Sequence, residues 1–202
     1  ERIYDTLIGS GIALLASYSL FPNWEHEKLK QAMTDIINAN RNYFHQVTLL
    51  YFDNSNHNST NYKVARKEVY VSTSNLASLF QRMFSEPKSK QLYIKELHQF
   101  TVLNHLLSSY VATLSLYNKE HDFLFENFEE LKPVSENTIY LLNEAAENIT
   151  LHKEEIRNVP LIRRKVQPDV KEDSPSAIIA EQFTSIQKVA YDIFKLAEKL
   201  KI

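Results

Sequence analysis

Histidine clusters are the first place to look for chemistry in this sequence, which contains seven histidines and no cysteine. His98 and His105 are two helical turns apart, whereas a helix that chelates a metal uses residues one turn apart. His152 and Glu155 have a closer spacing but lie in a strongly polar stretch. His26 and its glutamate neighbours would point in different directions on a helix. We therefore predict polar surface histidines and no metal site.

Patterns for covalent catalysis and for cofactor binding are also missing. Serines are frequent, but none is placed on the sharp strand-to-helix turn that exposes a nucleophile next to a histidine. His121 and Asp122 fit the start of a helix. The lack of cysteine excludes thiol catalysis and disulfides, and no glycine-rich phosphate loop is present. We predict that the protein is not an enzyme and uses no cofactor.

Three polar residues at the start of the chain are candidates for transport chemistry. Arg2 and Asp5 are three positions apart and can meet on one face of a helix, next to Thr6. An arginine at a helix N-terminus opposes the helix dipole, so its presence there needs another reason. Arg2 could attract anions to the mouth of a translocation path, with Asp5 and Thr6 positioning it. From spacing alone, an arginine that reaches towards lipid headgroups is the simpler interpretation.

These residues open a segment that resembles a membrane helix. No charged side chain occurs between Thr6 and Phe21, and a helix from Ile3 to Trp24 would span about 33 Å, close to the hydrocarbon thickness of about 30 Å. Trp24 would then anchor the far end at the membrane interface. The segment is only a marginal inserter by itself, because glycine, serine and threonine offset much of its hydrophobicity.

The small residues of this segment form a face of their own. Gly9, Ala13 and Ser17 are four positions apart and share one side of a helix. In lipid, a face of small residues lets a neighbouring helix approach closely, so we predict a helix-packing face here. A buried helix of a water-soluble bundle is the alternative. A signal peptide fits less well, because no basic region precedes the apolar run.

Composition limits the class of protein. The chain has 202 residues, of which 44% are hydrophobic and 24% charged, which is typical of a globular protein. A net charge of −2 leaves no footprint for nucleic acid. Only two glycines occur, far below the usual share of about 7%, which favours long helices over sheets with tight turns. Because the chain begins at Glu1 without a methionine, we expect a fragment of a longer protein.

The pattern of apolar residues predicts an all-α fold. Steps of three and four indicate helices over 24–52, about 62–85, 93–117, a stretch around 139–149 that Pro133 either kinks or starts, and 175–200. Residues 53–60, 117–122 and 157–174 are predicted breaks or loops. We expect an antiparallel bundle of five to six long helices. The predicted domains are a last transmembrane helix, or its remnant, over 1–23 and a helical domain over 24–202.

Two further features could bind a ligand. The aromatic residues Tyr93, Phe100, Tyr110 and Tyr117 recur at near-heptad spacing and could line a pocket, although such a stripe is much more often part of a core. The sequence LIRRKV at 161–166 could touch anionic headgroups, but three charges are few for a lipid site. A packed stripe and a solvated loop are the simpler expectations.

Two blocks of the sequence are similar to a known family. ERIYDTLIGSGIALLASYSLFPNWE resembles the closing membrane helix of the FUSC-type family of bacterial proteins (fusaric-acid-resistance-like, or aromatic acid exporters), especially its YccS/YhfK-like members. NYKVARKEVYVSTSNLASLFQRMFSEPK at 61–88 is similar to the cytoplasmic helix that follows in that family. The likeness covers about the first 90 residues, and beyond them the agreement is only in helical character.

The resemblance implies a bacterial inner-membrane protein in which residues after about 24 form a C-terminal cytoplasmic helical domain. It implies export of organic, aromatic anions by the parent protein, with an assembly or regulatory role for this domain. The implied partners are the other transmembrane helices of the parent protein, membrane lipid and a second copy of the chain. The alternative is a soluble helical-bundle interaction module without a transport role, in which the opening segment is a buried central helix.

Overall fold

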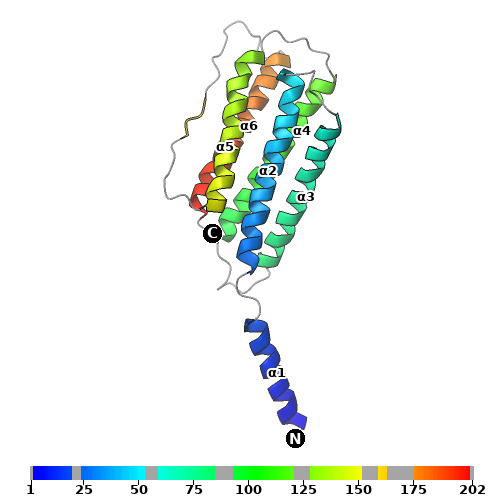
Figure 1. Cartoon of the computed structure of the whole chain (residues 1–202), viewed down its shortest axis with the longest axis vertical. Coiled ribbons are helices and arrows are strands. Elements are labelled where there is room, and N and C mark those ends of the chain that lie inside the picture. The colour runs from blue at the N-terminus through cyan, green and yellow to red at the C-terminus, as the bar shows by residue number, and fades with distance from the viewer. Residues whose placement is uncertain are drawn as a thin grey trace.

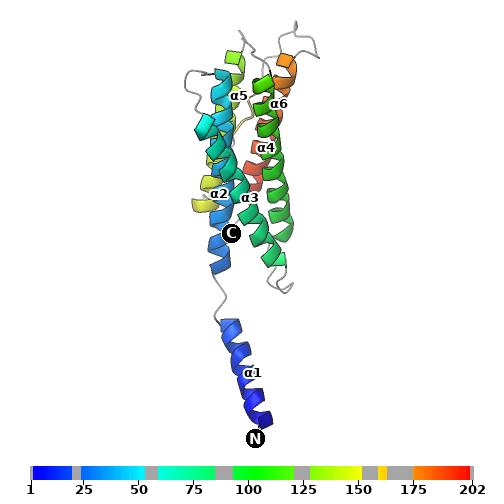
Figure 2. The same ribbon diagram turned by 90° about the vertical axis from the view of Figure 1, so that its right-hand side faces the viewer.

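The computed structural model describes residues 2–19, 24–52, 59–84, 93–120, 128–151, 159–162 and 175–200. Almost all of these residues are helical, and no strand occurs among them, which confirms the predicted all-α class. The α-helices are α1 (Arg2–Ser19), α2 (Trp24–Phe52), α3 (Ser59–Phe84), α4 (Ile94–Glu120), α5 (Lys132–Leu151) and α6 (Pro175–Lys199), with a 3₁₀ turn η2 (Phe128–Leu131) before α5. Figure 1 and Figure 2 show α2–α6 as one elongated bundle, with α1 beyond the end at which α2 begins.

Helix α2 is the centre of the bundle, since it packs against α3, α4 and α5. Helix α6 closes the bundle by packing against α5 and α4. Helices α2 to α5 alternate in direction, but α6 runs in the same direction as α5 (Figure 1 and Figure 2). This parallel pair departs from the expected antiparallel order. It is possible because residues 152–174 separate the two helices, enough chain for a long crossover connection.

Local sequence explains most helix boundaries. Helix α2 begins at Trp24 and α6 at Pro175, as predicted, and proline is favoured in a first turn because its missing N–H has no intrahelical partner there. Pro133 likewise lies in the first turn of α5, so it starts this helix instead of kinking a longer one. The prediction of a break at 117–122 is wrong for residues 117–120, because α4 continues to Glu120. Residues 121 and 122 lie outside the described part of the chain.

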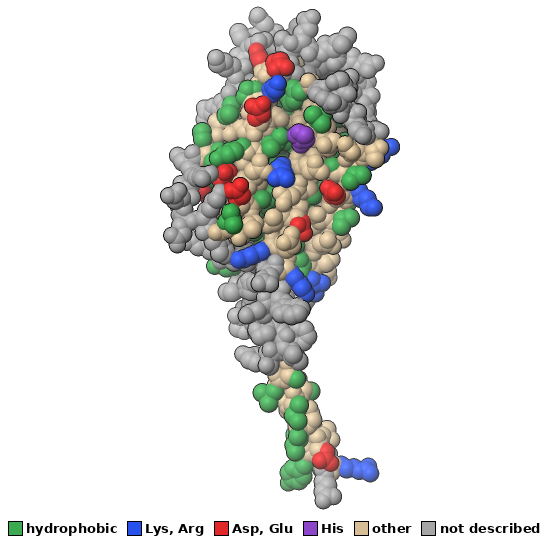
Figure 3. All heavy atoms as spheres, in the orientation of Figure 1, with side chains coloured by type: hydrophobic (Ala, Val, Ile, Leu, Met, Phe, Trp, Pro, Cys, Tyr) green, Lys and Arg blue, Asp and Glu red, His purple; other side chains and the backbone are tan. Residues whose placement is uncertain are grey.

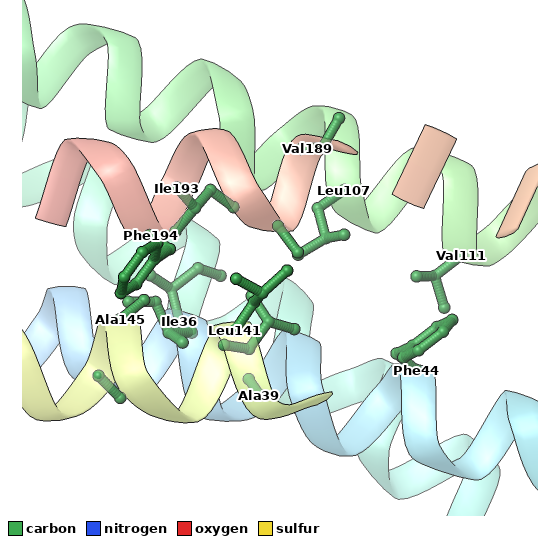
Figure 4. Packing of buried hydrophobic residues seen from close by; sticks show 14 of the residues in the cluster. Ile36, Ala39, Phe44, Leu107, Val111, Leu141, Ala145, Val189, Ile193 and Phe194 are labelled. Carbon is green, nitrogen blue, oxygen red and sulfur yellow. The ribbon is translucent and has the colours of Figure 1, made fainter. Parts of the chain in front are cut away.

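Aliphatic and aromatic side chains fill the space between α2, α4, α5 and α6, as Figure 4 shows. Phe183 on α6 joins two helices, since its ring lies 5.9 Å from that of Phe44, 5.7 Å from Tyr51 and 5.9 Å from Phe52, all on α2. Aromatic pairs at such distances add to the energy of burial. Among the described residues, every member of this core lies after position 24.

The aromatic stripe of α4 contributes mainly to this core. Phe100 is fully buried, and Tyr110 and Tyr117 pack against the core while remaining partly exposed. Tyr93 is 40% exposed just before α4 begins. These residues therefore act mainly as core packing, which is the simpler of the two expectations, and not as the lining of a ligand pocket.

A buried polar network connects α2 and α4. The side-chain amide of Asn40 donates to Asn104 Oδ1 at 3.1 Å, and Ser108 Oγ donates to Asn40 Oδ1 at 2.9 Å. Asn40 and Asn104 are almost completely buried, and the amide of Asn104 also donates to the Phe100 carbonyl oxygen. The amides of Asn40 and Asn104 therefore both have hydrogen-bond partners, which fixes how α2 and α4 are aligned.

Tyrosines make a second network, nearer the end of the bundle at which α2 ends. Tyr62 on α3 forms hydrogen bonds with Ser115 at 2.9 Å and with Tyr43 at 3.4 Å, and Tyr51 donates to the Leu114 carbonyl oxygen at 2.5 Å. Burial raises the pKa of Tyr43, helped by its hydrogen bond with Tyr62, and burial alone raises the pKa of Tyr51. Both hydroxyls therefore stay protonated and keep joining the helices at ordinary pH.

The Asn40–Asn104 contact makes a specific prediction about stability. Asn40→Leu should lower the free energy of unfolding by about 1–3 kcal/mol, because it leaves the buried Asn104 oxygen without its donor. Asn40→Leu combined with Asn104→Leu should cost less than the sum of the two single variants, since both partners are then apolar. Urea unfolding followed by circular dichroism measures these differences. Strictly additive losses would contradict a direct coupling between the two amides.

Candidate functional site: the exposed helix α1

Helix α1 has two different halves around its axis. At 3.6 residues per turn, its large apolar side chains share one half of the helix. Each of them is at least 60% exposed: Ile3, Tyr4, Leu7, Ile8, Ile12, Leu14 and Leu15. Figure 3 shows hydrophobic side chains in a stripe along α1. Helix α1 takes no part in the main helix packings of the described chain, so no described helix buries this apolar half.

Small and polar residues make up the opposite half of α1. Gly9 and Ala13 lie one turn apart on it, and a Cβ added at Gly9 would meet no atom within 4 Å. Ser17 belongs to the same helix, but its side chain is outside the described part of the structure. Gly9 and Ala13 thus share one exposed side of α1, the described residues of this chain supply no helix to contact it, and its role in helix packing stays a prediction.

Hydroxyl groups on α1 bond to the backbone of their own helix. Thr6 Oγ1 donates to the Arg2 carbonyl oxygen at 2.9 Å, and Ser10 Oγ donates to the Leu7 carbonyl oxygen at 3.0 Å. Such local bonds satisfy a hydroxyl where water is absent, so they lower the cost of placing Thr6 and Ser10 against lipid or another helix.

The three transport-path candidates lie near the free end of α1. Arg2, Asp5 and Thr6 are all exposed, and Thr6 contacts Arg2 through the backbone oxygen only. Among the described residues, Arg2 and Asp5 form no ion pair, so the spacing that allows them to meet is not used here. The structure thus places the three together on one turn without joining their charged groups.

The other predicted positions are only partly described. Trp24, the expected interface anchor, is the first residue of α2, and its side chain is not among the described ones. In the LIRRKV stretch, Leu161 and Ile162 are exposed, whereas 163–166 fall outside the described residues. Within the described ranges, no three histidine, aspartate or glutamate side chains lie together as a metal site would require.

None of the described helices, α1 included, has both the length and the apolar character needed to cross a membrane. This differs from the span expected over residues 1–23. Helix α1 as described covers 18 residues, and the charges of Arg2 and Asp5 together with its small polar residues offset the large apolar half.

The alternative of a buried central helix is also not what the structure shows. Its apolar side chains would have to be covered by the bundle, yet Leu14 and Leu15 remain 72% and 71% exposed. The bundle already has a central helix, α2, with a filled core around it.

A second polar site was missed by the sequence reasoning. A surface hollow of about 310 Å³ lies between α2 and α5 and is lined by Arg41, Asn42, His45, Ile139 and Asn143. Arg41 and His45 are one helical turn apart, and so are Ile139 and Asn143. That spacing places each pair on one face, but only the packing of α2 against α5 brings the two pairs together.

Comparison with known proteins gives two relatives. The chain is 23% identical over 201 residues to the inner membrane protein YccS of Escherichia coli. The aligned region covers 98% of this chain and 27% of YccS. The chain is 25% identical over 170 residues to an uncharacterized protein of Haemophilus influenzae, and this aligned region covers 77% of the chain and 23% of that protein. The chain therefore spans about a quarter of the length of these curated relatives.

No protein-family model and no solved structure matches the chain. The similarity to YccS nevertheless runs through both the opening helix and the bundle, well beyond the 90 residues whose likeness is visible by eye. The predicted resemblance is confirmed at this level: the chain is a distant relative of the inner membrane protein YccS.

Proposed function

We propose that the chain is the last membrane-associated helix and the cytoplasmic helical domain of a FUSC-like inner-membrane transporter that exports organic, aromatic anions. The bundle would serve assembly or regulation, and we assign it no enzymatic role. The observation that carries this proposal is α1, an exposed two-sided helix that directly precedes a complete bundle in a chain related to an inner membrane protein.

The surface of α1 supports a role among other membrane helices. Its 18 residues correspond to about 27 Å, slightly less than the hydrocarbon thickness of about 30 Å. A helix of such marginal hydrophobicity is stabilised in a bilayer when neighbouring helices cover its polar half. The half with Gly9 and Ala13 would contact those helices, and the half with Leu14 and Leu15 would face lipid.

The end of the bundle next to α1 is suited to a membrane surface. Helix α3 ends and α4 begins at this end (Figure 1 and Figure 2). Phe84 is 63% exposed there, and Arg82 and Lys95 are exposed close to it in sequence. Aromatic rings and basic side chains are favoured where headgroups meet water. This arrangement supports a position of this end of the bundle next to the membrane surface.

The proposed partners follow from these surfaces. They are the other transmembrane helices of the parent protein, membrane lipid and a second copy of the chain. We propose no nucleic-acid partner, because the net charge is −2.

Removal of α1 tests whether the bundle is an independent domain. A chain of residues 24–202 should stay helical and monodisperse without detergent, because its core contains no residue of α1. Size-exclusion chromatography and circular dichroism check this. If the shortened chain aggregates until residues 1–23 are restored, the interaction-module alternative gains support.

The small half of α1 is tested by adding bulk to it. Gly9→Leu and Ala13→Leu should each reduce assembly of the parent protein in membranes, since a large side chain keeps a neighbouring helix at a distance. Ile12→Leu adds no bulk on the apolar half and serves as the control. Crosslinking in membranes measures assembly, and the melting temperature of the bundle within the full chain 1–202 should not change. An oligomer unaffected by both variants would argue against this face as a helix contact.

Export itself is tested in cells. Cells that produce the parent protein should accumulate less of a labelled aromatic carboxylate such as salicylate than cells that lack it, and Gly9→Leu should reverse most of that difference. The measured quantity is retained label after washing. Equal retention with and without the protein would rule out this substrate class, while a normal bundle in the same cells would leave the helical-domain assignment in place.

A further inference from the structure

We propose that the hollow between α2 and α5 is a binding site for a small organic monocarboxylate, held by the guanidinium group of Arg41. The site involves no residue of α1 and does not depend on the transport proposal. It lies on the side of the bundle, between α2 and α5, which pack against each other without α1.

The charge of Arg41 has no acidic partner in the described chain. Its side chain is partly buried, and its Nη1 donates to Oδ1 of Asn143, which carries no charge. No carboxylate of the described residues forms an ion pair with it. A guanidinium group has five N–H donors, so most remain available. A partly buried cation is stabilised by an anion, and the open hollow lets one enter.

The other lining residues define the shape of the ligand. Asn143 holds one edge of the guanidinium group, which orients the remaining donors as a planar pair for a carboxylate. Ile139 supplies an apolar wall, so the hollow suits a ligand with a carbon body better than it suits an inorganic ion. A volume of about 310 Å³ is at the lower end of ligand pockets, so the ligand is small.

Glu68 limits the charge of the ligand. The amide of Asn42, at the edge of the hollow, donates to Glu68 Oε2 at 3.4 Å. This brings one carboxylate of α3 close to the site, and it would repel each negative charge that the ligand carries. A monocarboxylate pairs with Arg41 at the smallest cost of this kind, whereas phosphate or a dicarboxylate adds repulsion.

Butyrate is a suitable probe, tested with the full chain 1–202 in detergent. Butyrate should shift the ring resonances of His45 in a saturable way in NMR spectra and should raise the melting temperature. Butyramide has the same shape without the charge, and sodium chloride at equal ionic strength has the charge without the carbon body. Neither should reproduce the saturable shift.

Substitutions then identify the residue that binds. Arg41→Gln should weaken butyrate binding about tenfold or more, the effect of losing charge-assisted hydrogen bonds. Lys188→Gln removes the same charge from an exposed position of α6 and should leave the affinity unchanged. Equal affinity in wild type and Arg41→Gln, or a saturable shift by butyramide or chloride, would overturn the proposal. Tighter binding of phosphate than of butyrate would overturn the assigned ligand class.

The wild-type titrations keep the test decisive if Arg41→Gln does not fold. A saturable His45 shift by butyrate alone, and by neither control compound, then supports the site. No saturable shift by butyrate would overturn it.

Discussion

Burial of α2 against three neighbouring helices is the interaction on which the rest of the structure depends. Its inward residues, among them Ile36 and Phe44, are completely buried in the bundle, where α3, α4 and α5 pack against α2 and Phe183 of α6 reaches Phe44. Apolar burial on this scale dominates folding energy, while the Asn40 and Tyr62 networks fix how the neighbouring helices are aligned. Because this core closes without α1, the apolar half of α1 remains available for something outside the chain.

That division explains how one chain can combine two kinds of surface. The bundle buries most of its large apolar side chains, whereas α1 exposes large apolar side chains along half of its circumference. In water such a helix would promote association. Next to lipid and other helices the same exposure is favourable, and the backbone hydrogen bonds of Thr6 and Ser10 lower the cost of placing their hydroxyls there.

Sequence periodicity predicted the features that depend on local chemistry. The all-α class, the start of α2 at Trp24 and the start of α6 at Pro175 follow from apolar spacing and first-turn preferences. Features set by tertiary packing were not accessible in this way. Residues 117–120 stay helical because α4 continues along the bundle, and no local signal shows that α6 runs parallel to α5.

The candidate sites show the same limit. Spacing along one helix is enough to place Gly9 and Ala13 on one side, because both belong to α1. It could not find the hollow at Arg41, whose walls come from α2 and α5, about 100 residues apart in sequence. It also suggested an Arg2–Asp5 contact that the side chains do not make, since two exposed charges gain little from pairing in water.

The parallel course of α5 and α6 has a consequence for how the chain acquires its structure. Helix α6 fits between α4 and α5, and Phe183 reaches the rings of α2 from a distant part of the sequence. Contacts of such long range form late, because chain entropy must first be lost in closing the intervening loop. During synthesis the earlier helices therefore leave an apolar groove open until α6 emerges from the ribosome and docks. In this interval the nascent domain is most exposed to aggregation and most in need of a chaperone.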